Sequence, residues 1–184
     1  MKDDVIFPIH KQYITIDTRK RGMNMTEHLK IHSLFDLKET IAAEVFEGCT
    51  YPWEVLSKIK DAILQIGNSL PEEEYRKAGD NIWIAKSAKV APTACINGPA
   101  IIGKDAEIRH CAFNVILFNK VQVPHYNYVG DSILGYQSHM GAGAITSNVK
   151  SDKTLVVVKD GEQKLETGLK KFGAILADHV EVGC

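Results

Sequence analysis

The stretch that decides the fold is IAKSAKVAPTACINGPAIIGKDAEIRHCAF, residues 84–113. An aliphatic residue recurs in it at every sixth position, and an alanine follows each one four positions later. The aliphatic series is Ile84, Val90, Ile96, Ile102 and Ile108, and the alanines are Ala88, Ala94, Ala100, Ala106 and Ala112. A six-residue step returns to the same face of an extended chain but not of an α-helix. The repeat therefore predicts short strands with inward aliphatic residues, joined by tight corners at the alanines.

Repeats of this length bury their apolar side chains only when successive coils stack on one another. We therefore expect residues 81–184 to form a parallel β-helix. The register is lost after Phe113, because Ile108 and Val123 lie fifteen residues apart, so an irregularity is expected around 113–123. The six-residue step returns in two later pairs, Leu134 with Met140 and Leu176 with Val182.

Residues 150–170 do not fit the repeat. Asp160-Gly161 lies there between two strand-like runs, which is typical of a hairpin with a type I′ turn. This segment should project from the coil as a loop. Because the chain stops one residue after Gly183, the last coil is expected to be open at the C-terminal end.

The part before the repeat has helical spacing, and we expect a small helical domain over residues 34–80. Its first helix should run from Leu34 to Val45 and its second from Pro52 to Ile66, with Val55, Ile59, Ile63 and Ile66 as the apolar stripe. Ser69 and Glu72 form a capping-box pattern that predicts a third helix over Pro71 to Lys77. Residues 1–33 are expected to be a flexible arm.

The composition is balanced, with 22 basic and 23 acidic residues and a net charge of −1. We therefore expect neither nucleic acid nor a membrane surface as a partner. No apolar run reaches the roughly 18 residues of a membrane span, and the first residues do not form a signal peptide, which predicts a cytoplasmic protein. The four cysteines are far apart in the sequence without a CxxC pair, and are expected to be buried free thiols.

Two motifs follow the repeat: HYNYVGD at residues 125–131 matches HxxYxGD, and GAGAITSN at 141–148 matches GAGxxxxN. With the hexads, they resemble the acetyltransferase domain of bifunctional N-acetylglucosamine-1-phosphate uridyltransferases, within the hexapeptide-repeat acyltransferase superfamily. Standalone relatives described as pyrophosphorylase-related or nucleotidyltransferase-like are more similar still. The resemblance, which runs from Leu34 to the end, implies a mainly β homotrimer built on a single-stranded left-handed parallel β-helix. The glycine-rich loop for uridylyl transfer is missing from this chain.

The resemblance implies an N-acetyltransferase that transfers the acetyl group of acetyl-CoA to an amino sugar or sugar phosphate such as glucosamine 1-phosphate. His125 would be the general base, Tyr128 and Asn148 would contact the sugar, and the Ala142 backbone would approach the thioester. His139 stands where the family usually has an asparagine, an exchange that would either alter the substrate or abolish its binding. A free imidazole has a pKa of about 6.5 and so accepts a proton at neutral pH. No bound metal is expected.

The resemblance fails in one stretch. After Phe113 the relatives continue with further rungs that carry an arginine and a Glu-x-Lys for the sugar phosphate, and this chain lacks them. Charge-assisted contacts to phosphate are strong, so their loss should weaken phosphate recognition. Lys120, Lys150 and Lys153 are candidate substitutes, and ordinary solvent-exposed lysines are the alternative interpretation.

Two other functions stay open. The first is a non-catalytic trimeric assembly or regulatory module with a degenerate site. The second is a metalloprotein of the γ-carbonic anhydrase type, which shares the fold and binds zinc through three histidines. The candidates for such ligands, His110, His125, His139 and His179, lack the close pair of that family.

Overall fold

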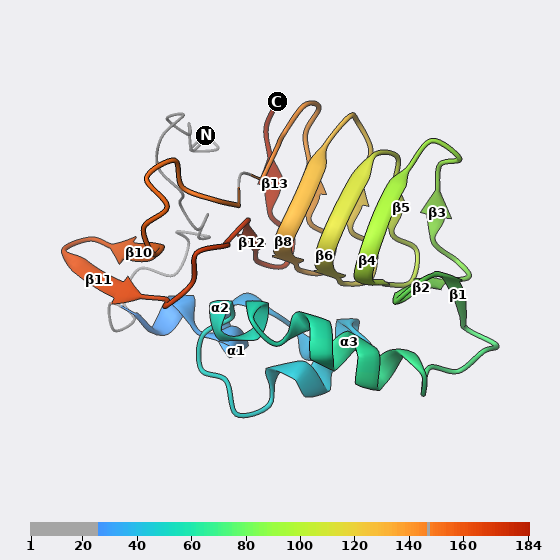
Figure 1. Ribbon diagram of the computed structural model, residues 1–184, viewed down its shortest axis with the longest axis horizontal. Helices are drawn as coiled ribbons and strands as arrows, with labels where there is room; N and C mark the ends of the chain where they lie inside the picture. The colour runs from blue at the N-terminus through green and yellow to red at the C-terminus, as the bar shows by residue number, and fades with distance from the viewer. Residues whose placement is uncertain (1–25, 147) are drawn as a thin grey trace.

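The computed structural model describes residues 26–146 and 148–184, in which parallel strands wind into a left-handed β-helix (Figure 1). Each coil passes over three faces. Face 1 contains β2 (Ile82–Ala85), the second halves of β4 (Cys95–Ile102), β6 (Cys111–Leu117) and β8 (Tyr128–Leu134), and β12 (Ile175–Leu176). Face 2 contains β3 (Lys89–Val90), β5 (Glu107–Ile108), β7 (Gln122–Val123), β9 (His139–Met140) and β13 (Glu181–Val182).

Face 3 contains the first halves of β4, β6 and β8, and Ile145 extends it through a bridge to Tyr128. The strands turn from face 3 to face 1 where the backbone is left-handed, with φ of 52° at Asn114 and 47° at Asp131. Such a φ is unusual for a residue with a side chain, and asparagine and aspartate tolerate it best.

The six-residue repeat forms strands, as the sequence predicts. Ile84 pairs with Ile102 and Val90 with Ile108, so three hexads make one coil. Ala88, Ala94 and Ala106 directly follow two-residue turns, as expected for corners. The corner prediction is wrong for Ala100 and Ala112, which lie inside β4 and β6, because those strands bend through face 3 into face 1 without a separate turn.

The β-helix runs through the segment where the sequence spacing breaks. Ile108 pairs directly with Val123, and Ala100 with Val115, so this coil is fifteen residues long. The next coil pairs Val115 with Ser132 at a distance of seventeen residues. Coils of different length therefore stack in register, because the paired strands stay aligned while the corners absorb the difference.

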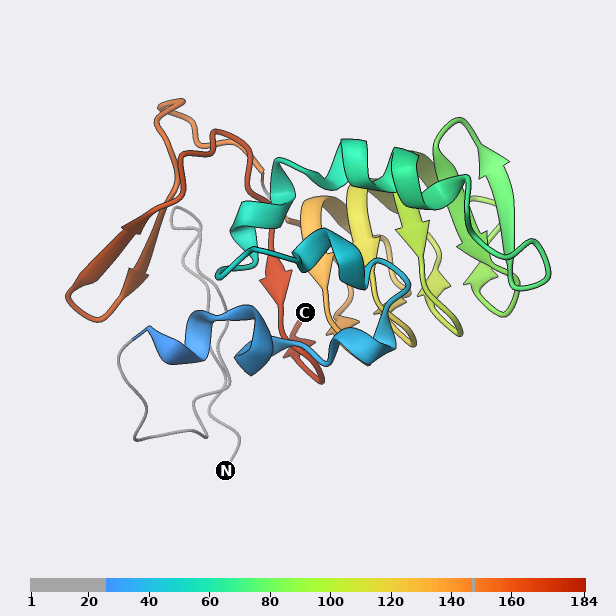
Figure 2. The ribbon, with the colours of Figure 1, turned by 90° about the horizontal axis from the view of Figure 1, so that it is seen from below.

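The segment between Asn148 and Phe172 leaves the coil as a hairpin of β10 (Val157–Asp160) and β11 (Gln163–Glu166), which projects away from the stack (Figures 1 and 2). Asp160 pairs with Gln163, so the turn residues are Gly161 and Glu162 rather than Asp160 and Gly161. Gly161 has a φ of 56° at the first turn position, but Glu162 at the second does not have a positive φ, whereas a type I′ turn needs one at both positions. The turn is therefore of type II′, and the type I′ prediction is wrong.

The helical part is more broken than its spacing predicts. Its elements are η1 (Glu27–Leu29), α1 (Ile31–Leu34), η2 (Leu37–Glu39), η3 (Ala43–Phe46), α2 (Trp53–Leu56) and α3 (Ile59–Gly67). The single helix predicted over Leu34–Val45 is wrong, because the backbone is extended at Asp36 and Thr40. Their side chains accept hydrogen bonds from Lys38 N and Ala42 N, a local alternative to helical bonding.

The third predicted helix, Pro71 to Lys77, is also wrong. A turn follows Pro71, and β1 (Tyr75–Gly79) then pairs antiparallel with β2, Tyr75 lying opposite Ala85. Tyr75 is buried there, and burial raises the pKa of its phenol to about 12. The capping pattern at Ser69 therefore marks a turn that leads into the β-helix.

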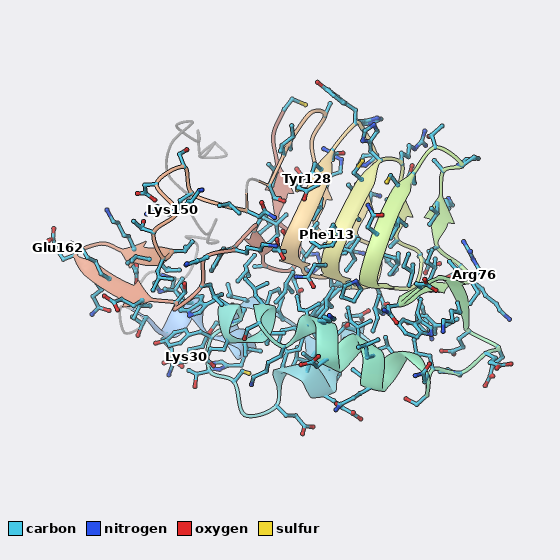
Figure 3. All side chains as sticks on the ribbon, in the orientation of Figure 1. Lys30, Arg76, Phe113, Tyr128, Lys150 and Glu162 are labelled. Carbon is cyan, nitrogen blue, oxygen red and sulfur yellow. The ribbon has the colours of Figure 1, made fainter. Side chains whose placement is uncertain are left out.

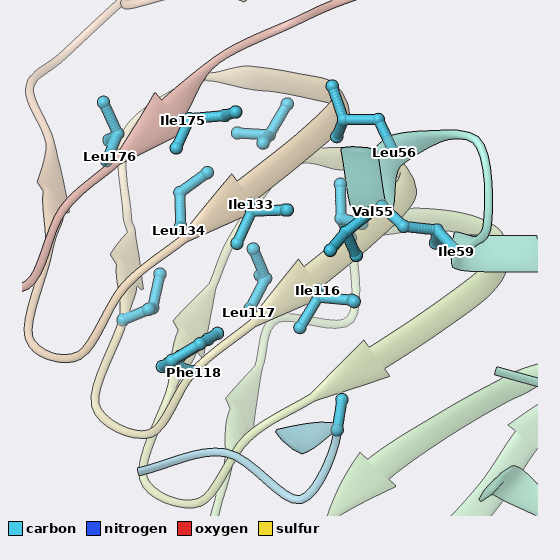
Figure 4. Packing of buried hydrophobic residues seen from close by; sticks show 14 of the residues in the cluster. Val55, Leu56, Ile59, Ile116, Leu117, Phe118, Ile133, Leu134, Ile175 and Leu176 are labelled. Atoms are coloured by element: carbon cyan, nitrogen blue, oxygen red, sulfur yellow. The ribbon is translucent and has the colours of Figure 1, made fainter. Parts of the chain in front are cut away.

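The helical part covers face 1 and shares one apolar core with the coil. Ile116 and Ile133 point out of the coil toward Val55 and Ile59 of the helices, whereas Leu117 points into it (Figure 4). All five side chains are fully buried. The stripe predicted on the second helix is thus the surface that packs on the strands. Within the described residues, no helix has the length and apolar character needed to cross a membrane.

Asp178 ties the helical part to two coils. Its carboxylate accepts hydrogen bonds from Asp36 N at 2.6 Å and from Tyr136 N at 2.7 Å, and its own N–H donates to Leu34 O at 2.9 Å. Burial raises the pKa of Asp178 in spite of the two backbone N–H groups that lower it.

Candidate functional site

The corners at 124–127 and 141–144 lie one above the other between faces 2 and 3. His125 O accepts a hydrogen bond of 3.0 Å from Gly143 N, which fixes one corner on the next. Gly143 has a φ of 72°, a conformation that glycine adopts without strain. The side chains of His125 and Ala142 are both exposed. The structure therefore brings the predicted base and the predicted thioester-binding residue to one open corner.

Asn127 holds the two corners together from inside the coil, where it is 1% exposed. Its Oδ1 accepts from His125 N at 2.9 Å, and its Nδ2 donates to Gly141 O at 2.7 Å and to Ala144 O at 3.2 Å. Sequence reasoning missed this residue, because it occupies a variable position of the HxxYxGD pattern. An amide at a corner was the available signal, since it can satisfy backbone groups on both sides.

Tyr126 was also missed, and no motif position marks it. It is 70% exposed, and its ring lies in a T-shaped arrangement with that of His110, with the ring centroids 6.1 Å apart. A Cβ added at Gly143 would lie 3.5 Å from Cε1 of Tyr126, so the ring lies beside that glycine. An exposed aromatic ring therefore borders the His125 corner.

Tyr128 lies on face 3 directly opposite Cys111 of the neighbouring strand β6, which also carries Phe113 (Figure 3). It is half-buried, and its pKa is raised by burial first and by the nearby Asp131 second. A Cβ at Gly130 would come within 2.6 Å of the Tyr128 hydroxyl oxygen. The glycine of the motif thus leaves the space that the phenol occupies.

Asp131 is buried at the other edge of face 3 and holds side chains from the coils on either side. Its Oδ1 accepts from Asn114 Nδ2 at 2.6 Å, and its Oδ2 accepts from Asn148 Nδ2. Asn148, predicted to contact the sugar, therefore uses its amide N–H on Asp131. The structure brings Tyr128 and Asn148 together around this carboxylate, whose role the sequence did not reveal.

His139 lies apart from these residues, on face 2, where Gln122 and Glu181 are its strand neighbours. Lys120 also lies elsewhere: its Nζ donates to the Tyr136 hydroxyl at 3.0 Å, which raises its pKa. Lys150 Nζ lies at the base of the hairpin segment and donates to Thr154 Oγ1 at 2.5 Å. The exposed Lys153 follows it in the same segment.

Among residues 26–146 and 148–184, no three histidine, cysteine, aspartate or glutamate side chains are grouped closely enough to hold a metal ion. The prediction that the cysteines are buried is wrong. Cys95 and Cys184 are exposed, and Cys49 and Cys111 are half-buried. Cys95 and Cys111, distant in the sequence, are direct partners in adjacent strands, because one coil returns the chain to the same place on face 3.

A comparison with known proteins finds relatives for about half of the chain. It is 33% identical to the bifunctional protein GlmU of Methanococcus aeolicus over 96 residues, which are 52% of this chain and 22% of that protein. The corresponding protein of a Synechococcus strain is 32% identical over 110 residues, 58% of this chain and 24% of the relative.

The bifunctional sugar-1-phosphate nucleotidylyltransferase/acetyltransferase of Sulfurisphaera tokodaii is 29% identical over 82 residues, 45% of this chain and 20% of that protein. The chain thus spans less than a quarter of the length of each of these relatives. No family model matches it. About half of this chain is therefore homologous to part of the bifunctional GlmU and sugar-1-phosphate nucleotidylyltransferase/acetyltransferase proteins, and its β-solenoid is consistent with a hexapeptide-repeat acetyltransferase domain.

Proposed function

We propose that the protein is an acetyl-CoA-dependent N-acetyltransferase that acts on an amino sugar or sugar phosphate of the glucosamine 1-phosphate type, as a cytoplasmic homotrimer. One observation carries the proposal: the hydrogen bond from Gly143 N to His125 O stacks the two motif corners. Two observations are consistent with it: the name of the Sulfurisphaera tokodaii relative includes acetyltransferase activity, and the balanced charge leaves a local site to bind any anion.

The reaction needs a base and a place for the thioester within reach of each other. The amine nitrogen of the sugar attacks the thioester carbonyl carbon, a C–N bond forms, and the C–S bond breaks to release coenzyme A. The imidazole of His125 takes the proton that the nitrogen loses. A positioned general base contributes typically about 10²–10⁴-fold to such a rate. Ala142, one coil further on, borders the thioester with its backbone.

The sugar would lie along face 3 from His125 toward Tyr128 and Asn148. Asn148 Nδ2 is bound to Asp131, which leaves the amide oxygen to accept from a sugar hydroxyl. His139 faces away on face 2, so we assign it to the sugar of a neighbouring copy. This assignment requires the homotrimer, with the active site between subunits.

The test is calorimetric titration of the full chain with coenzyme A, followed by an assay of thiol release from acetyl-CoA with glucosamine 1-phosphate. We expect heat on titration, thiol release, and a loss of about 10²–10⁴-fold in kcat for His125→Ala. His32→Ala, an exposed histidine on the helical part, is the matched control and should keep full activity.

Equal activity in His125→Ala would remove the base role. Sedimentation equilibrium gives the mass of the particle, which is three times the 20.4 kDa chain mass for a trimer. A trimer that gives no heat with coenzyme A and releases no thiol would favour the non-catalytic trimeric module.

A further inference from the structure

Cys95 and Cys111 occupy one column of face 3. They are direct partners in the parallel pairing of β4 with β6, so both side chains point to the same side of the sheet. Neighbouring strands lie about 4.8 Å apart. Disulfides usually join Cα atoms about 4.4–6.8 Å apart, so the strand spacing brings the backbones of these two cysteines within the range that a disulfide spans.

The two thiols differ in their surroundings. Cys95 is exposed and Cys111 is half-buried, and Asn97 Nδ2 donates to Cys95 Sγ at 3.5 Å. The pKa of Cys111 is raised by its burial first, and then by the charge of Cys95 and a hydrogen bond with it. The thiols are therefore in contact, and Cys95 is the one that a dissolved reagent meets first.

The other two cysteines are placed differently. Cys49 Sγ accepts a hydrogen bond of 3.0 Å from Lys58 Nζ on the helical part, and Cys184 is the exposed last residue. Neither is a strand partner of another cysteine among the described residues. Among the described residues, the register of the β-helix therefore places one pair of cysteines, Cys95 and Cys111, opposite each other.

We propose that Cys95 and Cys111 form an oxidisable dithiol site, which a hydroperoxide converts to a disulfide across two coils of the β-helix. The proposal stands on the strand register and the shared outward direction. It does not depend on acetyl transfer.

The chemistry needs one equivalent of peroxide. The Cys95 thiolate attacks one peroxide oxygen, the O–O bond breaks, and Cys95 becomes a sulfenic acid while the other oxygen leaves as water. The Cys111 sulfur then attacks the Cys95 sulfur and displaces the hydroxyl, which also leaves as water. Two thiols are oxidised and one hydrogen peroxide is reduced to two waters. Cys95 reacts first because reactivity follows exposure and thiolate character.

The disulfide would lie next to Tyr128, which follows Cys111 in the same column. A cross-link between coils restricts the unfolded chain more than the folded one and so raises the melting temperature. Oxidation should therefore raise the melting temperature of the wild type. Cys111→Ser, which cannot form the bond, should show no such rise.

The test treats the full-length chain with hydrogen peroxide, counts thiols after denaturation, and identifies cross-linked peptides by mass spectrometry without reduction. We expect the loss of two of the four thiols, a chain lighter by two hydrogen atoms, and a peptide that joins Cys95 to Cys111. Cys95→Ser and Cys111→Ser should abolish the cross-link, and the double variant Cys49→Ser/Cys184→Ser should keep it. Four thiols left intact, oxygen added to Cys95 without a cross-link, or a disulfide between chains would each overturn the proposal.

Discussion

Face 1 and face 3 share three strands, β4, β6 and β8, whose two halves differ in what points outward. On face 1 the outward residues Ile101, Ile116 and Ile133 are fully buried under the helices. On face 3 the outward residues include Cys95, Cys111, Tyr128 and Ile145, and Ile145 is 63% exposed.

The difference shows how one repeat serves two purposes. Both faces bury an inward aliphatic residue, so the coil itself does not distinguish them. Aliphatic residues that point outward need a cover, because exposed apolar surface is costly, and the helical part supplies it. The face without a cover carries the thiols and the phenol and borders the His125 corner. Stability should therefore depend most on face 1, and chemistry on face 3.

The largest expected effect comes from the same substitution made on both faces. Ile116→Ala removes a buried side chain between β6 and the helices and should lower the free energy of unfolding by about 2–5 kcal/mol. Ile145→Ala, at an exposed site, should change it by less than about 0.5 kcal/mol. Denaturant unfolding measures both. Equal losses would mean that another copy of the chain covers face 3 as well.

The next prediction tests how Asp178 holds the helical part on the β-helix. Asp178→Ala leaves the N–H groups of Asp36 and Tyr136 without their acceptor, and should lower the free energy of unfolding by about 1–3 kcal/mol. Asp178→Asn keeps one acceptor oxygen and should lose less. Chemical denaturation of the three proteins gives the order. Identical stabilities for all three proteins would show that the hydrogen bonds to this carboxylate do not stabilise the contact between the helical part and the coils.

On face 3, Gly130→Ala should push Tyr128 out of place, because the new Cβ would come within 2.6 Å of its hydroxyl oxygen. Such overpacking costs about 1–3 kcal/mol. In a Tyr128→Ala background the same change should cost much less, and a double-mutant cycle of unfolding free energies measures the coupling. A coupling of zero would mean that the phenol does not fill this space.

The smallest effect appears only in alkali. The pKa of Tyr75 is raised to about 12 by burial, whereas an unfolded tyrosine has a pKa of about 10. The folded state therefore holds this proton more tightly, so stability should be intact below pH 10 and fall as the pH rises from 10 to 12. Tyr75→Phe should show a shallower fall in a pH series of thermal melts. If the melting temperatures of the wild type and Tyr75→Phe fall equally with pH, the loss of stability in alkali comes from groups other than Tyr75.

Much of the fold follows from the sequence because the hexads impose a register that only a stacked coil satisfies. The apolar stripe with Val55, Ile59 and Ile63 also follows from its spacing, and these residues do pack on the strands. The shorter coil was not foreseeable from spacing alone, since a six-residue count has no way to show that Ile108 pairs with Val123. The β1 strand was missed because a capping box and a turn use the same residues at Ser69 to Glu72.

The candidate site was predictable only where a motif names the residue. The resemblance identified His125 and Ala142 as site residues, and the structure stacks the corners on which they lie. Asn127, Tyr126 and Asp131 are recognisable only once the coils are stacked, because their partners come from other coils. The contact of Cys95 with Cys111 has the same cause.

The most direct test of the account is hydrogen–deuterium exchange with and without coenzyme A. We predict that coenzyme A slows exchange at the corners 124–127 and 141–144 and leaves α3 and the face 1 strands unchanged. Slower exchange confined to the helical part, with both corners unaffected, would contradict the division between a covered structural face and an open reactive one.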